Sequence, residues 1–230
     1  MKNFIVTGAS GGIGAEVTRR LARRADNVAI VARSEDKLVK LADELNESKA
    51  KIRVYTADLT ETGVCHQMVN QLASEWGSID GLVNNAGYMS GGTNLDLDLE
   101  SFDTMLDLNV RAPIHLSVRV AEIMKTAGGG TIINIASVAG TTVIDGIGGY
   151  CATKFAIRAF SEASHAELKK HGIKVSSICP GYVATDMTSD FDVKPENMIQ
   201  TTDVADAVSY ILDSSTHVCP REIHLMPQKT

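Results

Sequence analysis

Short apolar runs alternate along this chain with longer segments in which apolar residues recur every three or four positions. The seven runs are Phe4–Val6, Val28–Val31, Ile52–Val54, Ile79–Val83, Thr131–Ile135, Ile173–Ile178 and Glu222–Met226. Helical spacing fills the stretches between them, over residues 13–21, 38–45, 64–72, 100–125, 150–170 and 202–213. Continuous apolar strands that each lead into a helix predict a parallel sheet that is buried on both faces.

This alternation predicts an α/β fold class. Right-handed crossovers turn the successive strand–helix–strand units into a Rossmann-type doubly wound parallel sheet of about seven strands, with helices on both faces. No linker, repeat or low-complexity tract interrupts the pattern, so residues 1–230 are expected to form a single domain. Ligands of such sheets bind outside the carboxyl ends of the strands, so candidate functional residues are sought there.

Charge and composition exclude several kinds of partner. The chain has 22 Lys and Arg against 28 Asp and Glu, a formal net charge of −6, which argues against nucleic acid or an anionic membrane surface. The longest uncharged stretch, residues 126–144, is too polar to span a bilayer. One basic cluster, expected to be a solvated helix face, consists of Arg19, Arg20, Arg23 and Arg24.

The cysteines and histidines indicate neither disulfides nor a metal site. The four cysteines form no C-x-x-C pair, and no targeting segment precedes the first strand, which predicts reduced thiols in a cytoplasmic protein. The six histidines show no ligand spacing of the H-E-x-x-H kind. The sequence therefore predicts no bound metal.

A glycine-rich turn joins the first strand to the first helix. It reads Thr7-Gly8-Ala9-Ser10-Gly11-Gly12-Ile13-Gly14. Glycines allow a positive φ and a close approach of backbone to phosphate, whose charge a helix N-terminus attracts. The strict G-x-G-x-x-G pattern is not met, because Val17 stands where its last glycine would fall. Such a turn can serve packing alone, which stays open at this point.

The end of the second strand bears on the choice of dinucleotide. It reads Val31-Ala32-Arg33-Ser34, without the acidic residue that binds the ribose 2′-hydroxyl of NAD. Arg33 is suited to a 2′-phosphate, so NADP(H) is the preferred cofactor and NAD(H) the alternative. Arg33 can also be a solvated surface cation without a role in binding. Glu35 and Asp36 fit the first turn of a helix that Ser34 is expected to cap.

Candidate chemistry lies in the second half of the chain. Tyr150 and Lys154 are four residues apart in a predicted helix and therefore share a face. A nearby cation is expected to lower the phenol pKa from its ordinary value of about 10, which would make the phenol a usable acid and base. Ser137 ends the fifth strand, where its hydroxyl can meet a carbonyl oxygen. Taken singly, these residues also fit a surface pair and a turn serine.

The ordered set of motifs resembles the short-chain dehydrogenases/reductases, in their compact single-domain branch. The resemblance covers nearly the whole chain through Thr7-Gly8-x-x-x-Gly12-x-Gly14, Asp58-Leu59, Asn84-Asn85-Ala86-Gly87, Asn109-Val110, Ser137, Tyr150-x-x-x-Lys154 and Pro180-Gly181. It implies that Tyr150 is the acid/base, that Ser137 orients the substrate carbonyl, that Asn109 holds a water in a proton relay and that Lys154 lowers the phenol pKa. It implies cofactor binding by Gly8, Ser10, Gly11, Gly12, Ile13, Gly14, Arg33, Asp58, Leu59, Asn85, Ala86, Gly87, Tyr150, Lys154, Pro180 and Gly181.

The expected activity is NADP(H)-dependent interconversion of a ketone or aldehyde and an alcohol. The alternatives are reduction of 3-oxoacyl groups on a carrier protein, and a dinucleotide-binding regulator without turnover. A lid over the substrate is expected in residues 182–200, which mix Tyr182, Met187, Phe191 and Met198 with Asp186, Asp190 and Asp192. The helices over residues 100–125 and 150–170 have more apolar positions than one sheet face needs, which predicts burial against another subunit. The family resemblance implies that this pair of helices forms a homodimer or homotetramer.

Overall fold

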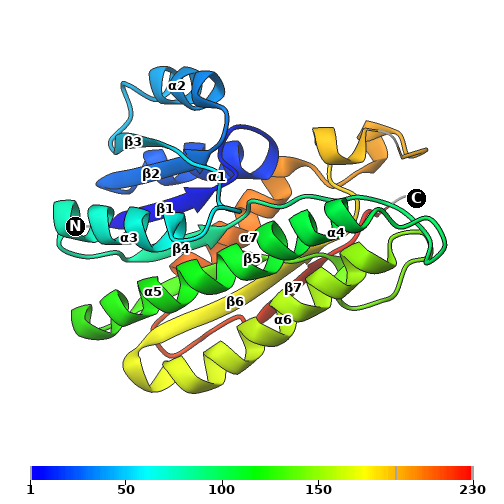
Figure 1. The fold of residues 1–230 in the computed structure, drawn as a ribbon. Helices are drawn as coiled ribbons and strands as arrows, with labels where there is room; N and C mark the ends of the chain where they lie inside the picture. Colours follow the sequence, from blue (N-terminus) through cyan, green and yellow to red (C-terminus); the bar gives the residue numbers. More distant parts are fainter. Residues whose placement is uncertain (1, 190, 229–230) are drawn as a thin grey trace.

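The computed structural model describes residues 2–189 and 191–228, and its centre is a parallel sheet (Figure 1). The strands lie in the order β3-β2-β1-β4-β5-β6-β7, and every neighbouring pair is parallel. Their bounds are β1 Asn3–Thr7, β2 Asn27–Ala32, β3 Lys51–Thr56, β4 Gly81–Asn84, β5 Gly130–Ile135, β6 Ile173–Pro180 and β7 Glu222–Leu225. The predicted doubly wound sheet of seven strands is confirmed.

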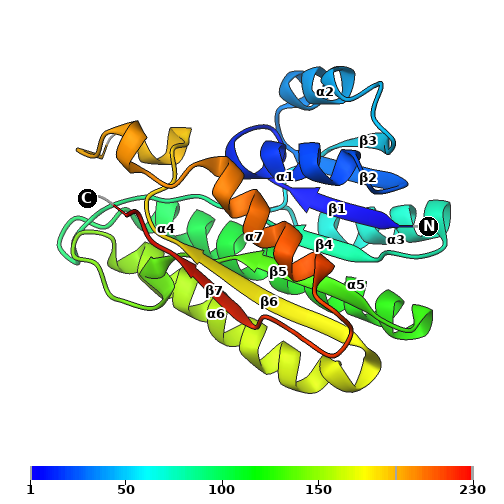
Figure 2. The same cartoon turned by 180° about the vertical axis from the view of Figure 1, so that it is seen from behind.

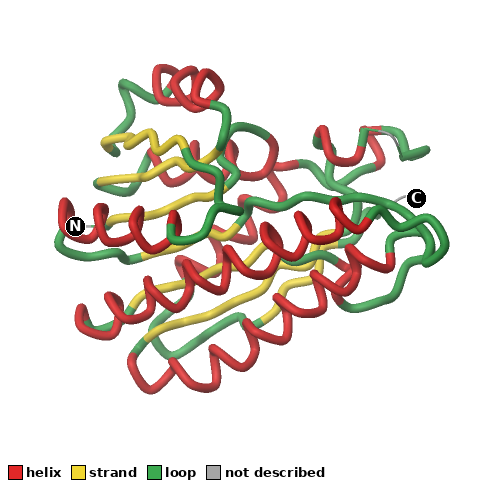
Figure 3. The backbone as a smooth tube through the Cα atoms, viewed as in Figure 1, coloured by secondary structure: helices red, strands yellow, loops and turns green. Residues whose placement is uncertain are grey.

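Helices cover both faces of the sheet, as the two opposite views show (Figures 1 and 2). One face carries α1 (Gly12–Ala22), α2 (Glu35–Glu44) and α7 (Thr201–Asp213). The other carries α3 (Val64–Trp76), α4 (Leu99–Leu106), α5 (Ala112–Ala127) and α6 (Gly148–Leu168). The strands form the middle layer (Figure 3), and a separate apolar core fills each interface between sheet and helices. Among the described residues, no helix has both the length and the apolarity to cross a membrane.

The predicted helix over residues 100–125 is divided into three parts. Asp98 caps α4 by accepting from the backbone N–H groups of Glu100 and Ser101, and α5 ends at a left-handed Gly128. Between α4 and α5, residues Asp107–Arg111 form a π-helical turn, in which one extra residue enters the hydrogen-bond ladder. This turn contains Asn109, one of the predicted catalytic residues.

The basic cluster lies at the end of α1 and just after it; Arg23 is exposed, as the sequence predicted, but the other three arginines form ion pairs. Arg19 pairs with Glu44 of α2 at 2.7 Å, and two further arginines pair with α7: Arg20 with Asp206 at 2.9 Å and Arg24 with Asp213 at 2.6 Å. Helix α1 lies between α2 and α7, so these three cations reach acidic residues of both neighbours while they stay partly exposed to water. Ion pairs this exposed each contribute at most about 1 kcal/mol, but they join three helices on one face.

The strand order creates the place where a ligand can bind. From β1 the chain proceeds outward to β2 and β3, and then returns to the other side of β1 to form β4. The loops after β1 and β4 therefore lead in opposite directions and leave a crevice at the carboxyl ends of the central strands.

Candidate active site

A cleft of about 1140 Å³ lies at the carboxyl ends of the strands, and most of the predicted site residues line it. Ser137, Tyr150 and Lys154 line it together with the predicted cofactor-binding residues other than Gly14. These are Gly8, Ser10, Gly11, Gly12, Ile13, Arg33, Asp58, Leu59, Asn85, Ala86, Gly87, Pro180 and Gly181. Gly14 and Asn109 lie behind the walls of the cleft.

The glycines of the glycine-rich turn have different structural roles. Gly8 and Gly12 have φ values of 65° and 52°, which side chains rarely adopt. A Cβ on Gly14 would lie 2.3 Å from the carbonyl oxygen of Gly8, so this glycine allows α1 to pack against the turn. Around Gly11 there is open space within 4 Å. The turn therefore combines the packing that the sequence left open with a helix N-terminus that faces the cleft.

Hydrogen bonds hold the loop after β4 against this turn. The Oγ1 of Thr7 accepts from the backbone N–H groups of Asn85 and Ala86, both at 3.0 Å. The side-chain amide of Asn85 donates to the carbonyl oxygens of Thr7 at 3.0 Å and Gly8 at 3.1 Å. Asn85 therefore satisfies backbone groups, and it fixes the two loops that flank the crevice. Thr7 was not singled out from the sequence, although it begins the glycine motif.

Asp58 has a similarly local role at the end of β3. Its Oδ1 accepts from the backbone N–H of Thr60 at 2.9 Å and from the Thr60 hydroxyl at 2.7 Å. Burial alone would raise the pKa of the Asp58 carboxyl, but these hydrogen bonds and the charge of Arg33 outweigh it and lower that pKa. The carboxylate therefore stays charged at the rim of the cleft, where it lies 4.0 Å from the Arg33 guanidinium.

Two cations stand at the end of the cleft beside β2. The Arg33 side chain is 75% exposed, and Lys37 lines the same wall from the first turns of α2. The sequence interpretation missed Lys37, which follows Arg33 by four residues. Glu35 and Asp36 are exposed and lie outside the cleft lining. Ser34 occupies the N-cap position of α2 but makes no side-chain capping hydrogen bond, so that part of the prediction is wrong.

Tyr150 and Lys154 lie on the first turns of α6, where both are buried. The Lys154 Nζ donates to the carbonyl oxygen of Ile135 at 3.0 Å and lies 5.6 Å from the centre of the Tyr150 ring. Burial lowers the pKa of Lys154 to about 8. Burial raises the pKa of Tyr150 to about 12, although its hydrogen bond with Ser137 acts in the opposite direction. The phenol pKa is therefore raised and not lowered as expected, because desolvation outweighs the hydrogen bond with Ser137.

Ser137 combines a structural and a chemical position. It precedes a short 3₁₀ turn, Val138–Gly140, and its Oγ accepts from the backbone N–H of Ala139 at 3.1 Å. The same hydroxyl faces Tyr150 in the cleft. Ser137 is thus a turn serine, which was one interpretation of the sequence, and its hydroxyl also lies beside the Tyr150 phenol.

Asn109 is 2% exposed and is held by two neighbours. Its Oδ1 accepts from the backbone N–H of Tyr88 at 2.8 Å, and its Nδ2 donates to the Tyr88 carbonyl at 2.8 Å and to the Thr153 hydroxyl at 3.1 Å. A Cβ on Gly87 would lie 3.3 Å from the Asn109 Oδ1 and 3.7 Å from the Lys154 Nζ. The glycine therefore leaves space between this amide and the lysine. Neither Tyr88 nor Thr153 was predicted.

The first part of the segment after β6 lines the cleft, with Tyr182, Met187 and Phe191, whereas Asp192 and Met198 are not in the lining. The segment contains two 3₁₀ turns, Asp186–Thr188 and Pro195–Asn197, and its Tyr182 and Phe191 rings lie 5.3 Å apart. Asp190 lies outside the described residues. Apolar side chains that line the cleft include Met89, Ile144 and Ile147, which cluster with Tyr150, and also Met187, Phe191 and Met226.

Known proteins share both the sequence pattern and the fold. The family model for short chain dehydrogenases matches residues 2–196. An uncharacterized oxidoreductase of Staphylococcus epidermidis is 34% identical over 226 residues, covering 98% of this chain and 97% of that protein. Another, of Staphylococcus saprophyticus, is 32% identical over 227 residues, covering 98% of this chain and 97% of that protein.

Solved structures agree over the whole fold. An alcohol dehydrogenase from the archaeon Thermococcus sibiricus, complexed with 5-hydroxy-NADP, has a TM-score of 0.92 and 27% identity, covering 100% of this chain and 98% of that one. An actinorhodin polyketide ketoreductase variant with NADPH has a TM-score of 0.89 and 28% identity, covering 98% and 96%. The chain therefore belongs to the short-chain dehydrogenase/reductase family of oxidoreductases.

Proposed function

We propose that this oxidoreductase uses NADP(H) to interconvert a ketone or aldehyde and the corresponding alcohol. The observation that carries the proposal is the meeting of Ser137, Tyr150 and Lys154 in the same cleft as the glycine-rich turn and the N-terminus of α1. A dinucleotide bound by the turn would extend toward these three side chains. A regulator without turnover would not need a buried, ordered phenol and ammonium at that point.

The cofactor fits the residues that are present. The positive φ values of Gly8 and Gly12 and the open space at Gly11 leave room for a pyrophosphate at the N-terminus of α1. We assign Asp58 and Leu59 to the adenine end, and Asn85, Ala86, Gly87, Pro180 and Gly181 to the nicotinamide end. Lys154 would bind the nicotinamide ribose. When bound, the cofactor supplies or accepts the hydride.

The three side chains divide the remaining chemistry. During reduction, negative charge develops on the carbonyl oxygen, and hydroxyl donors from Ser137 and Tyr150 would stabilise it. With a pKa of about 12 the phenol is protonated at neutral pH but is a weak acid, so to act as the general acid it needs a neighbour that stabilises the phenolate. The Lys154 ammonium would stabilise the phenolate left behind. We assign Asn109 to hold a water that returns a proton by way of Lys154, because Gly87 leaves space between them.

The walls of the cleft favour a small or medium, largely apolar carbonyl compound. Ile144 and Ile147 pack in one apolar cluster with Tyr150, and Met187 and Phe191 from the segment after β6 line the same cleft. Proteins of similar structure include an alcohol dehydrogenase, a polyketide ketoreductase and an acetoin dehydrogenase, the last from Salmonella typhimurium at 25% identity and a TM-score of 0.89 over 98% of this chain and 94% of that one. All three names denote chemistry between an alcohol and a carbonyl group.

We also propose that the protein is a single-domain cytoplasmic enzyme that self-associates. The four cysteines are free, which suits a reducing compartment. Apolar side chains remain exposed on α5 and α6, including Val118 at 48% and Phe155 at 36%. These helices are the elements through which the sequence predicts a homodimer or homotetramer.

The test is a direct assay of turnover. Purified protein is mixed with NADPH and a panel of ketones, aldehydes and 3-oxoacyl thioesters while NADPH absorbance is followed, and NADH is tested in parallel. We expect NADPH oxidation with at least one uncharged carbonyl compound. NADPH binding without oxidation across the panel would favour the regulator, and activity confined to thioesters of a carrier protein would favour the 3-oxoacyl alternative.

A further inference from the structure

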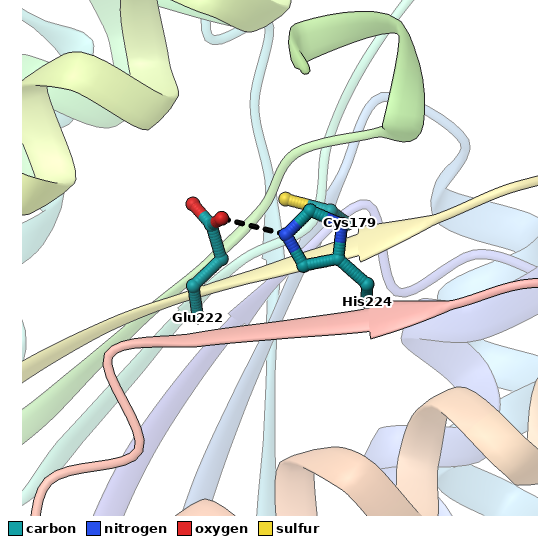
Figure 4. Close-up of side chains that lie close together, drawn as sticks. All are labelled: Cys179, Glu222 and His224. Carbon is teal, nitrogen blue, oxygen red and sulfur yellow. Dashed lines mark hydrogen bonds and ion pairs between the residues drawn. The ribbon is translucent and has the colours of Figure 1, made fainter. Parts of the chain in front are cut away.

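Three metal-binding side chains meet at the edge of the sheet beside the cleft (Figure 4). Cys179 projects from β6, and Glu222 and His224 from β7. One possible ligand atom of each lies within 4.8 Å of the others. We propose that Cys179, Glu222 and His224 form a binding site for a borderline-soft divalent metal ion such as Zn²⁺.

The geometry of the sheet puts these donors together. Cys179 and His224 are direct partners in the register of β6 and β7, so their side chains share one face. Glu222 precedes His224 by two residues on the same strand and therefore faces the same way. The histidine spacing in the sequence could not show this cluster, because its members come from two strands and only Glu222 and His224 are close in sequence.

The distances require little adjustment on metal binding. The Glu222 Oε1 and the His224 Nε2 lie 2.6 Å apart in a hydrogen bond. Donors about 2.0–2.3 Å from a tetrahedral ion lie roughly 3.5 Å from each other, so this pair must separate and the thiol must approach by about 1 Å. His224 is 45% exposed, which leaves its ring free to turn, while Cys179 is fully buried on a rigid strand.

The chemistry of the donors selects the kind of ion. Thiolate with imidazole favours Zn²⁺ over Mg²⁺ or Ca²⁺, which prefer oxygen ligands. Arg158 donates to both carboxylate oxygens of Glu222, its Nη2 to Oε1 at 3.1 Å. A carboxylate oxygen has two lone pairs, so Oε1 can retain this contact while it binds an ion.

Three protein donors leave one tetrahedral position for water or a small ligand. His224 also lines the cleft that contains Tyr150, so a bound ion would stand at the rim of this space. The site is separate from the catalytic set, and the inference does not depend on the proposed NADP(H) chemistry.

The test is titration of the metal-free full-length protein with Co²⁺, followed by its displacement with Zn²⁺. We expect one Co²⁺ per chain, with the intense near-ultraviolet absorption that a thiolate ligand produces, no competition from Mg²⁺ and reversal by Zn²⁺. Cys179→Ser should abolish the thiolate absorption and weaken binding at least tenfold. Cys65→Ser is the matched control, because Cys65 is also buried but lies on α3, and it should bind as the unmodified protein does.

His224→Ala provides a second arm at an exposed position, in case the buried serine variant does not fold. It should also weaken binding at least tenfold, with an unchanged far-ultraviolet circular dichroism spectrum. Absence of Co²⁺ binding at micromolar protein would overturn the proposal. Binding without the thiolate absorption, or equal binding by His224→Ala, would assign the ion to another place and would overturn it as well.

Discussion

The Lys154 ammonium is buried, and burial disfavours its charged form. Its pKa of about 8 lies below the ordinary 10.5, so between these values the unfolded chain binds a proton that the folded protein lacks. Stability conferred by this group therefore rises with pH through that window. Below pH 8 the folded state bears the full cost of the buried ammonium, which is about 3 kcal/mol.

We therefore predict that Lys154→Met stabilises the cofactor-free protein at pH 7 while it removes turnover. The hydrogen bond to Ile135 is lost, so the net gain is expected to be about 2 kcal/mol. The gain should shrink as the pH approaches 10.5. Urea denaturation at pH 7, 8.5 and 10 measures it, with exposed Lys40→Met as the control. A variant less stable than the unmodified protein at pH 7 would show that the ammonium is stabilised in place.

The second prediction concerns the Tyr150 hydroxyl. Tyr150→Phe keeps the ring and its packing but removes the proton donor, so kcat/KM for carbonyl reduction should fall 10²–10⁴-fold, the usual contribution of general acid catalysis. NADPH affinity, measured by fluorescence titration, should change little. Tyr210→Phe on the surface of α7 is the matched control and should keep full activity. Near-normal reduction by Tyr150→Phe would refute the assigned acid.

Cofactor preference is the third prediction at this scale. Arg33 and Lys37 both line the β2 end of the cleft, and a charge-assisted hydrogen bond contributes about 1.5–3 kcal/mol, so NADPH should be preferred over NADH about ten- to hundredfold. Arg33→Ala and Lys37→Ala should each reduce the preference, and Ala32→Asp should reverse it. Lys40→Ala, on α2 but outside the cleft lining, is the control. The comparison uses kcat/KM for both cofactors, and better use of NADH by the unmodified enzyme would contradict the assignment.

At the scale of the element, the β1–α1 turn depends on close packing at Gly14. A Cβ there would lie 2.3 Å from the Gly8 carbonyl oxygen, so Gly14→Ala should lower the free energy of unfolding by about 1–3 kcal/mol and weaken cofactor binding. Gly11→Ala is the matched control, because Gly11 has an extended φ of −179° and open space around it. Urea denaturation without cofactor compares the two. Equal stability of both variants would mean that the turn can move apart.

The helices and strands show which features of the fold a sequence pattern can predict. Apolar runs located every strand to within a few residues, because burial on both faces of a parallel sheet leaves a continuous signal. The π-helical turn at Asp107–Arg111 was not predicted, since one extra residue in the ladder barely changes helical spacing. For the site, the order of the motifs predicted the residues that meet in the cleft. The pKa of Tyr150 is raised where the sequence predicted a lower value, because the burial that raises it depends on the folded structure and cannot be read from the motif. Lys37 was missed because it lies inside a helix rather than in the motif.

At the scale of the whole molecule, the two faces of the sheet differ in what their helices leave uncovered. On one face α1 is joined to α2 and α7 by ion pairs. On the other, α5 and α6 lie side by side in front of the sheet (Figure 1) and expose Val118 and Phe155. If the two side chains are covered by a second copy of the chain, two-fold symmetry supplies the same side chains from the partner.

The last prediction is therefore association through α5 and α6. Sedimentation equilibrium at micromolar concentration should show a dimer or tetramer. The double variant Val118→Glu/Phe155→Glu would place four carboxylates in a two-fold interface, and it should weaken the dimer at least tenfold without loss of secondary structure. Val39→Glu, at an equally exposed apolar position on α2 of the opposite face, is the control and should associate normally. A monomeric unmodified protein would contradict the prediction, and dissociation by Val39→Glu alone would move the interface to the α1–α2–α7 face.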